Sequence, residues 1–159
     1  MAVSLREPDA ADYETYAERR TAQYIEQIIA AGHLSVDAAR EKALRDTAEL
    51  LPDGMRTRGH VIRRVFADER AVGWLWFAEQ SRSESAGVGH VYDLQIDEPY
   101  RRRGYAREAM LLAEEEAQTR GLHALTLNVF GHNAGARALY AELGYGETAV
   151  QMKKSLGRE

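Results

Sequence analysis

A strand–helix–strand passage in the second half of the chain constrains the fold more than any other feature. Residues 88–97 form an apolar, strand-like run, and residues 124–129 form another. Between them, residues 103–120 have helical spacing with a stripe of small residues that suits close packing on a sheet, and Gly121 ends this helix. Two strands joined through a helix are expected to be parallel neighbours, so the passage predicts an α/β fold.

The turn before the predicted helix is rich in arginine. It reads Pro-Tyr-Arg-Arg-Arg-Gly-Tyr-Ala-Arg over residues 99–107, so four arginines crowd the helix N-terminus. That end of a helix carries partial positive charge and unpaired N–H groups, and it normally favours Asp or Glu. Arginines there, beside a Gly-x-Ala turn, indicate that an anion fills the gap, and a phosphate-rich ligand is the natural candidate. The turn also lies at the carboxyl end of a strand, where open α/β sheets bind ligands.

The rest of the chain alternates between helical and strand-like spacing. The further predicted elements are a strand at 3–6, helices at 10–31 and 36–51, a hairpin of strands at 61–66 and 71–77, a helix at 133–143 and a last strand at 145–152. Ser35 is the expected N-cap of the second helix, and Gly32 the stop of the first. No repeat or second-domain boundary interrupts the pattern, so residues 1–159 are predicted to form one domain.

Composition excludes several classes of protein and site. The chain has 159 residues and a net charge of −4, which argues against general nucleic-acid binding. It has no cysteine, so disulfides, thiolate metal sites and a cysteine nucleophile are excluded. No apolar run approaches the roughly 20 residues of a membrane span, and the N-terminus has no signal-peptide pattern. We therefore expect a cytoplasmic protein with no membrane or nucleic-acid partner, and the five scattered histidines predict no metal site.

Two motifs in this chain resemble those of the GCN5-related N-acetyltransferase (GNAT) superfamily. The pattern R-x-x-G-x-A over residues 101–106 is similar to the family's pyrophosphate-binding signature. The pattern N-x-x-A-x-x-L-Y-x-x-x-G-Y over residues 133–145 is similar to its second hallmark, and the two occur in the family's order. The resemblance covers nearly the whole chain. It implies a twisted, mostly antiparallel sheet of about six or seven strands, with the parallel crossover and about four helices.

The resemblance also implies that acetyl-CoA is the co-substrate. In the family, the backbone of the turn binds the pyrophosphate and the preceding strand lends backbone groups to pantetheine. A glycine-containing turn supports this assignment independently, because it lets N–H groups approach phosphate oxygens without a blocking side chain. The implied cofactor-binding residues are Leu94, Gln95, Ile96, Arg101, Arg102, Arg103, Gly104, Tyr105, Ala106, Arg107 and Asn133.

Tyr140 is the leading catalytic candidate. The resemblance implies that Tyr140 gives a proton to the departing CoA thiolate, and a phenol is a suitable donor within hydrogen-bond reach. Asn133 lies seven residues earlier, on nearly the same face of the predicted helix. The alternatives are an N-cap role for Asn133 and an amphipathic core position for Tyr140.

The general base is marked less clearly. His90 and Asp93 lie on the strand that supplies a base in some family members, and His90 is the leading candidate. Alternation along a regular strand predicts that the two residues face opposite sides, so at most one faces the acetyl group. The alternative for each is a half-buried polar residue with a local partner. Asn128 stands where some amino-terminal acetyltransferases of the family have a glutamate, so their mechanism does not transfer directly.

We expect direct transfer to a primary amine in a ternary complex, because the chain has neither a cysteine nucleophile nor a Gly-x-Ser-x-Gly elbow. The acceptor is a small amine, an amino acid, an aminoglycoside-like compound, or a peptide amine such as a protein N-terminus or lysine. The acidic net charge suits a cationic amine. In the family the first two helices shape the acceptor site, and here they carry Tyr13, Tyr16, Tyr24 and Glu26.

Three alternatives concern the protein as a whole. One is a non-catalytic acyl-CoA-binding or sensing module with the same fold. Another is a different nucleotide-binding α/β protein, against which the missing Gly-x-Gly-x-x-Gly counts. A homodimer stays open as the assembly.

Overall fold

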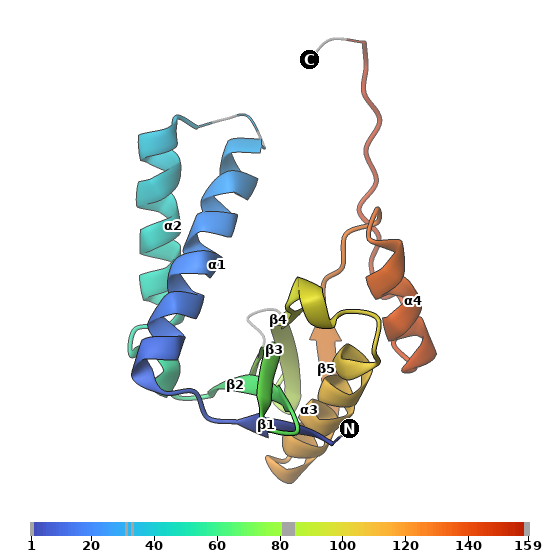
Figure 1. Ribbon diagram of the computed structural model, residues 1–159. Coiled ribbons are helices and arrows are strands. Elements are labelled where there is room, and N and C mark those ends of the chain that lie inside the picture. Colours follow the sequence, from blue (N-terminus) through green and yellow to red (C-terminus); the bar gives the residue numbers. More distant parts are fainter. Residues whose placement is uncertain (1, 31, 33, 81–84, 158–159) are drawn as a thin grey trace. The chain divides into compact units, whose positions relative to one another are not determined.

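Five strands form one mixed sheet in the computed structural model, in the order β1-β2-β3-β4-β5 (Figure 1). The structure describes residues 2–30, 32, 34–80 and 85–157. The strands are β1 (Val3–Arg6), β2 (His60–Ala67), β3 (Arg70–Ala78), β4 (Val88–Ile96) and β5 (Ala124–Leu127). Neighbours are antiparallel except β4 and β5, which are parallel and joined through helix α3 (Tyr105–Thr119). The predicted α/β class and the parallel crossover are confirmed.

The helices agree with the predicted ranges to within two residues. Besides α3 they are α1 (Ala10–Ala30), α2 (Val36–Leu50), α4 (Ala134–Glu142) and the short 3-10 helices η1 (Gly54–Arg56) and η2 (Glu98–Tyr100). Residue 31, the last of the first predicted helix, lies outside the described residues. Local signals set the boundaries: Ser35 Oγ accepts from Ala38 N at 3.2 Å, and Gly32 takes a φ of 84°. None of the described helices has the length and apolar composition that a bilayer span requires.

The chain divides into two units, Met1–Leu127 and Asn128–Glu159. In the first unit α1 covers one face of the sheet, where the Tyr16 ring stacks on Trp74 at 4.2 Å. Helix α3 covers the other face, where Arg63 Nη2 lies 2.8 Å from Glu116 Oε1. The buried core on the α1 face contains Tyr16, Trp74 and Trp76 together with Ile62 of β2. The expectation of one domain stays a prediction.

A β-bulge at Tyr92 changes which side chains of β4 face α1. Trp76 pairs with Asp93, but the next residue of β3, Phe77, pairs with Val91, so Tyr92 is the extra residue. His90 and Asp93 therefore point to the same face as Trp76. The expectation that the two residues face opposite sides is wrong, because it assumed an uninterrupted alternation.

The two parallel strands are paired over only part of their length. Among the described residues, β5 pairs with β4 from Val88 to Val91, and β5 ends at Leu127. Beyond Val91, strand β4 continues to Ile96 while paired to β3. The outer edge of its second half is thus unpaired by β5, and its backbone N–H and C=O groups need other partners.

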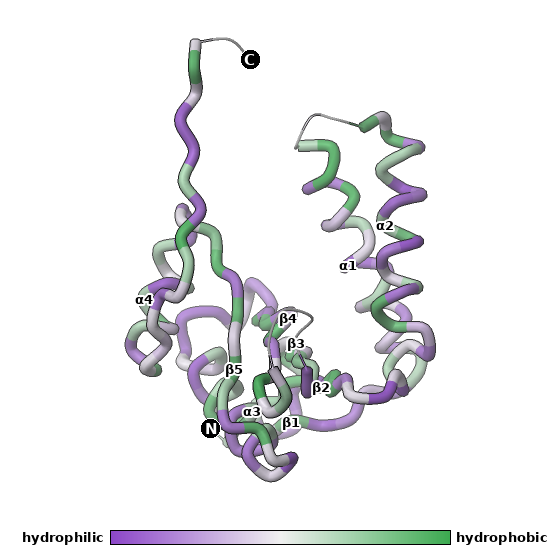
Figure 2. The backbone as a smooth tube through the Cα atoms, turned by 180° about the vertical axis from the view of Figure 1, so that it is seen from behind, coloured by the Kyte–Doolittle hydropathy of each residue, from purple (hydrophilic) through white to green (hydrophobic). Residues whose placement is uncertain are grey.

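The second unit contains α4 followed by an extended segment. The strand predicted at 145–152 is wrong, because no residue from 145 to 157 is assigned to a strand. The described residues form five strands, and the expected six or seven are not reached. Figure 2 shows that the segment mixes hydrophilic and hydrophobic residues. Its apolar side chains are exposed, with Met152 at 88% and Val150 at 65%. A strand needs a neighbour for its ladder, and among the described residues this segment pairs with none.

Candidate active site

The arginine-rich turn forms the exposed entrance to α3. After η2 the backbone takes a left-handed conformation at Arg102 (φ 64°) and again at Gly104 (φ 83°). Gly104 is the N-cap of α3, and no side chain caps this helix end. A glycine N-cap places no side chain in front of the first turn, and helix N-termini of this kind bind anions.

The four arginines of the turn have different surroundings. Arg101 Nε donates to the backbone carbonyl of Ile96 at 2.7 Å, which fastens the turn to the end of β4. Arg107 Nη1 lies 3.6 Å from Glu108 Oε1. Arg102 and Arg103 are exposed and form no ion pair with any residue that the structure describes. These two guanidinium groups are the ones best able to contact an added anion.

The other predicted cofactor residues on this part of the chain are contiguous with the turn. Leu94 and Ile96 pair with Leu75 and Gly73, which directs their side chains toward α3. The Gln95 side chain points the other way and donates to Gln23 Oε1 at 3.2 Å. The Tyr105 side chain is buried, and Ala106 lies in the first turn of α3. The main-chain groups of these residues are thus the parts suited to a ligand.

His90 has one ring nitrogen engaged by β5. It pairs with Thr126 across the parallel ladder, and its Nδ1 lies 2.7 Å from Thr126 Oγ1. The Thr126 hydroxyl donates to the Gly89 carbonyl at 3.3 Å, so it accepts from Nδ1–H of His90. The lone pair of the neutral ring is then on Nε2. Burial lowers the pKa of His90 below its ordinary 6.5, which favours this neutral, basic form.

Asp93 is held in a buried hydrogen-bonded network. The Tyr16 hydroxyl donates to Oδ2 at 2.5 Å, and Gln95 Nε2 donates to Oδ1 at 3.3 Å. Arg20 Nη1 lies 3.6 Å from the same Oδ1. Burial raises the pKa of Asp93 above its ordinary value despite these partners. Both carboxyl oxygens are engaged, so Asp93 joins α1 to the sheet and is poorly placed to take a proton from a substrate.

An aromatic cluster surrounds His90, and sequence reasoning missed most of it. The Tyr92 ring meets His90 edge-on with centroids 4.8 Å apart, and it stacks on Trp76 at 4.7 Å. Trp76 Nε1 donates to His60 Nδ1 at 3.0 Å, and burial lowers the pKa of His60. His60 and Thr126 were not predicted as site residues, because they join His90 only through cross-strand register.

Helix α4 carries the two predicted site residues of the second unit. Asn133 is its N-cap, and Asn133 Oδ1 accepts from Ala136 N at 3.1 Å. Tyr140 is half-buried and meets the Tyr145 ring edge-on at 5.8 Å. The N-cap alternative for Asn133 is confirmed, and its contact with a cofactor stays a prediction. Asn128 lies one residue beyond β5.

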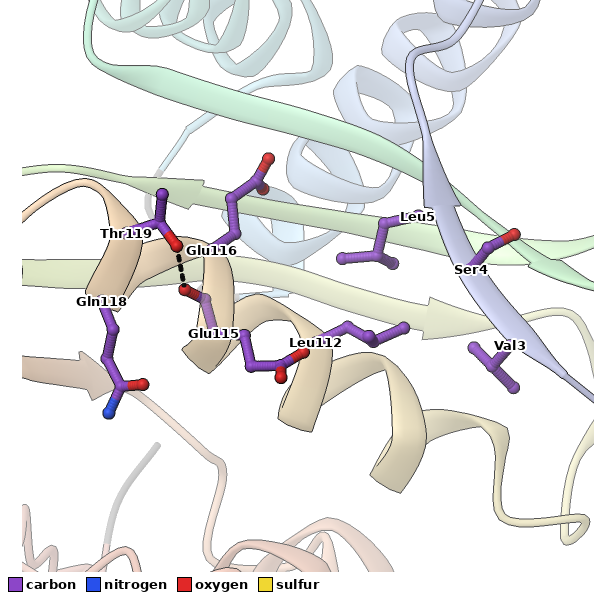
Figure 3. A pocket seen from close by; sticks show the side chains of 8 residues that line it. All are labelled: Val3, Ser4, Leu5, Leu112, Glu115, Glu116, Gln118 and Thr119. Atoms are coloured by element: carbon purple, nitrogen blue, oxygen red, sulfur yellow. Dashed lines mark hydrogen bonds between the residues drawn. The ribbon is translucent and has the colours of Figure 1, made fainter.

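Two pockets lie on opposite faces of the sheet. One, of about 390 Å³, lies between α1, α2 and β4 and is lined by Tyr24, Lys42, Asp46, Glu49, Leu50 and Tyr92. Its wall includes Tyr92, the neighbour of His90. The other, of about 610 Å³, lies between β1 and α3 (Figure 3) and is lined by Val3, Ser4, Leu5, Leu112, Glu115, Glu116, Gln118 and Thr119. It contains none of the predicted site residues. No group of three His, Asp or Glu in the described part of the chain could hold a metal ion.

Comparisons with known proteins agree with this geometry. The model of the acetyltransferase (GNAT) family matches residues 14–145. The chain is 33% identical to the uncharacterized N-acetyltransferase YycN of Bacillus subtilis (strain 168), over 98% of this chain and 100% of that protein. The crystal structure of YycN superposes with a TM-score of 0.85, at 30% identity, over 99% of this chain and 100% of YycN.

A more distant structure agrees in fold alone. AAC(6')-Iy, in complex with the bisubstrate analog CoA-S-monomethyl-acetylneamine, is 16% identical and superposes with a TM-score of 0.64 over 98% of each chain. The family model and the YycN match each span most of the sequence. This chain therefore belongs to the acetyltransferase (GNAT) family and is an acetyl-CoA-dependent acyltransferase.

Proposed function

We propose that the protein transfers the acetyl group of acetyl-CoA directly to a primary amine of a small molecule or peptide, in a ternary complex. The amine nitrogen bonds to the acetyl carbon, the carbon–sulfur bond breaks, the amine loses one proton and the sulfur gains one. His90 takes the proton and Tyr140 donates the other. Residues 1–159 act as one catalytic domain in this proposal.

The unpaired half of β4 and the turn that follows it carry the proposal. Main-chain groups of Leu94, Gln95 and Ile96 lie beyond the last β5 pair, and the Ile96 carbonyl already accepts from Arg101 Nε. A pantetheine arm has amide groups that can bond with the other main-chain groups of this stretch. The turn at 101–107 then offers a helix N-terminus whose N-cap residue, Gly104, has no side chain to block an approaching anion. A thin amide-bearing arm ending in a pyrophosphate, as in acetyl-CoA, fits this sequence of partners.

His90 is the proposed general base because its unengaged nitrogen is the basic one. Thr126 fixes the proton on Nδ1, which leaves Nε2 to accept. Asp93, the competing candidate, is occupied by Tyr16, Gln95 and Arg20. The lowered pKa of His90 keeps the base form populated at neutral pH.

Tyr140 is the proposed general acid, and Asn133 contacts the cofactor. The support is the family motif over residues 133–145, together with the half-buried Tyr140 phenol on a helix whose N-cap is Asn133. A phenol keeps its proton at neutral pH and can give it to a thiolate within hydrogen-bond reach.

Calorimetry and a thiol-release assay test this proposal together. Acetyl-CoA and CoA should bind, ATP and NAD should not, and at least one amine of a panel should release CoA thiol. Tyr140→Phe should lower that rate by about 100-fold. Binding of acetyl-CoA without turnover of any amine would support the sensing module instead. Binding of NAD without CoA would overturn the donor assignment, and full activity of Tyr140→Phe would remove Tyr140 from the mechanism.

A further inference from the structure

The pocket between α1, α2 and β4 has the size and lining of a small-molecule site. Its volume is about 390 Å³, near the lower end of the range for such sites. The rings of Tyr24 and Tyr92 and the side chain of Leu50 give it apolar walls. Its three charged residues, Lys42, Asp46 and Glu49, all come from α2. Figure 1 shows α1 and α2 running side by side.

The charges of this pocket do not cancel. Lys42 Nζ lies 2.6 Å from Asp46 Oδ2, and the Tyr24 hydroxyl donates to the same oxygen at 2.7 Å. The hydrogen bonds from Lys42 and Tyr24 lower the pKa of Asp46, so the Lys42–Asp46 pair stays ionised and neutral in sum. Glu49 lies about one turn further along α2 and is exposed. It forms no ion pair or hydrogen bond with a described residue, which leaves one negative charge uncompensated.

Tyr92 connects this pocket to His90. The His90 and Tyr92 rings meet edge-on with their centroids 4.8 Å apart. Trp76 stacks on the Tyr92 ring, with their centroids 4.7 Å apart. The bulge at Tyr92 directs both side chains to the face that α1 covers. His90 does not itself line the pocket, so a ligand that fills the pocket reaches His90 only by extending past the Tyr92 ring.

We propose that this pocket binds the acceptor as a small diamine, with one ammonium group at Glu49 and the reacting amine next to His90. The inference rests on the proposed function, since it names the acceptor of that reaction. The Tyr92 ring lies beside the chain between the two nitrogens and adds attraction for a cation. A carboxylate at the far end of the acceptor would meet Glu49 as a like charge.

Three amines of equal chain length test the charge requirement: 1,4-diaminobutane, butylamine and 4-aminobutanoate. The kcat/KM for the diamine should exceed that for butylamine by about 5-fold, mostly through KM, as expected for one exposed ion pair. The value for 4-aminobutanoate should be lower than that for butylamine. Equal values for diamine and butylamine, or a preference for 4-aminobutanoate, would overturn the inference.

A matched pair of variants tests Glu49 itself. Glu49→Gln should abolish the preference for the diamine, whereas Glu41→Gln should retain it. Glu41 is also exposed on α2, but it does not line the pocket. A preference that survives in Glu49→Gln would contradict the assignment.

Calorimetry with 1,4-diaminobutane separates this inference from the proposed function. In one outcome no amine is acetylated, yet the diamine binds to the wild type and binds at least about 5-fold more weakly to Glu49→Gln. The pocket assignment then stands and the transfer reaction fails. If the diamine does not bind while butylamine is acetylated, the transfer reaction stands and the pocket assignment fails. If the diamine does not bind and no amine of the panel is acetylated, both are overturned.

Discussion

His90 and Asp93 lie on one face of β4 although they are three residues apart. The bulge at Tyr92 adds one residue between them and so brings both toward α1. The two side chains have different hydrogen-bond partners, and these partners suit them to different roles. Asp93 accepts from the Tyr16 hydroxyl at 2.5 Å, whereas His90 is engaged through Nδ1 and has its lone pair on Nε2. The same bulge thus supplies a core anchor and a candidate base within one short stretch of strand.

Replacing His90 tests the candidate base directly. His90→Gln should lower kcat by about 100-fold or more, because glutamine cannot accept the amine proton. In the wild type, kcat/KM should fall as the pH falls through the pKa of His90, which burial places below 6.5. Measuring kcat/KM from pH 5 to 8 should show this acid limb in the wild type and not in the residual activity of His90→Gln.

An exposed histidine provides the control. His123→Gln should keep the wild-type rate and the acid limb, since His123 is exposed on the connection before β5. Wild-type activity in His90→Gln would instead assign the proton transfer to water or to another group.

Thr126 is expected to position His90 without touching the substrate. Thr126→Val removes the hydroxyl that accepts from Nδ1–H, so both ring tautomers become accessible. The rate should fall by about 5- to 10-fold, the equivalent of one neutral hydrogen bond. The acid limb of the pH profile should also move, which a purely structural effect would not produce. Thr126→Ser should restore both, and failure of this rescue would argue against the tautomer assignment.

Local sequence signals predicted the helices well. The N-caps Ser35 and Asn133 and the stop at Gly32 act through hydrogen bonds and dihedral angles within a few residues. The parallel crossover was also predictable, since strand, turn and helix follow one another directly. The signature at 101–106 was correctly placed just before and at the start of α3, because it lies in the turn between that strand and that helix.

Features that depend on strand register were not predictable. Val65 pairs with Gly73 and Phe66 pairs with Ala71, so Val72 is an extra residue of β3. Counting strand pairs back from the hairpin turn therefore assigns His60 a partner that is one residue away from the observed one. A second bulge at Tyr92 reversed the expected facing of His90 and Asp93. The strand expected at 145–152 failed for a related reason. Its residues have strand-like patterning, but a strand also requires a paired neighbour.

Gly104 tests the link between backbone geometry and donor binding. A Cβ at this position would meet nothing within 4 Å, so Gly104→Ala causes strain only through the φ of 83°. The free energy of unfolding should fall by about 1 kcal/mol. Calorimetry should show weaker acetyl-CoA binding, because alanine disfavours the left-handed φ and the backbone of the turn shifts to relieve this strain.

Gly135→Ala is the control: it adds a methyl group in open space inside α4, and it should raise stability by about 0.5–1 kcal/mol. Unchanged acetyl-CoA affinity in Gly104→Ala would argue against pyrophosphate binding at this turn.

Tyr16→Phe should destabilise the protein in a pH-dependent way. The change keeps a ring for stacking on Trp74 but removes the donor to buried Asp93, at a cost of about 1–3 kcal/mol at neutral pH.

Burial raises the folded-state pKa of Asp93 above 3.8, and losing the Tyr16 donor raises it further. Between 3.8 and the folded pKa the folded state holds more protons than the unfolded one, so stability falls as pH rises. The deficit of Tyr16→Phe should therefore be small below pH 3.8 and grow with pH, as measured by urea unfolding. Tyr100→Phe, a half-buried tyrosine of η2, should change stability by less than about 0.5 kcal/mol at every pH. A deficit independent of pH would mean that ring packing accounts for the loss.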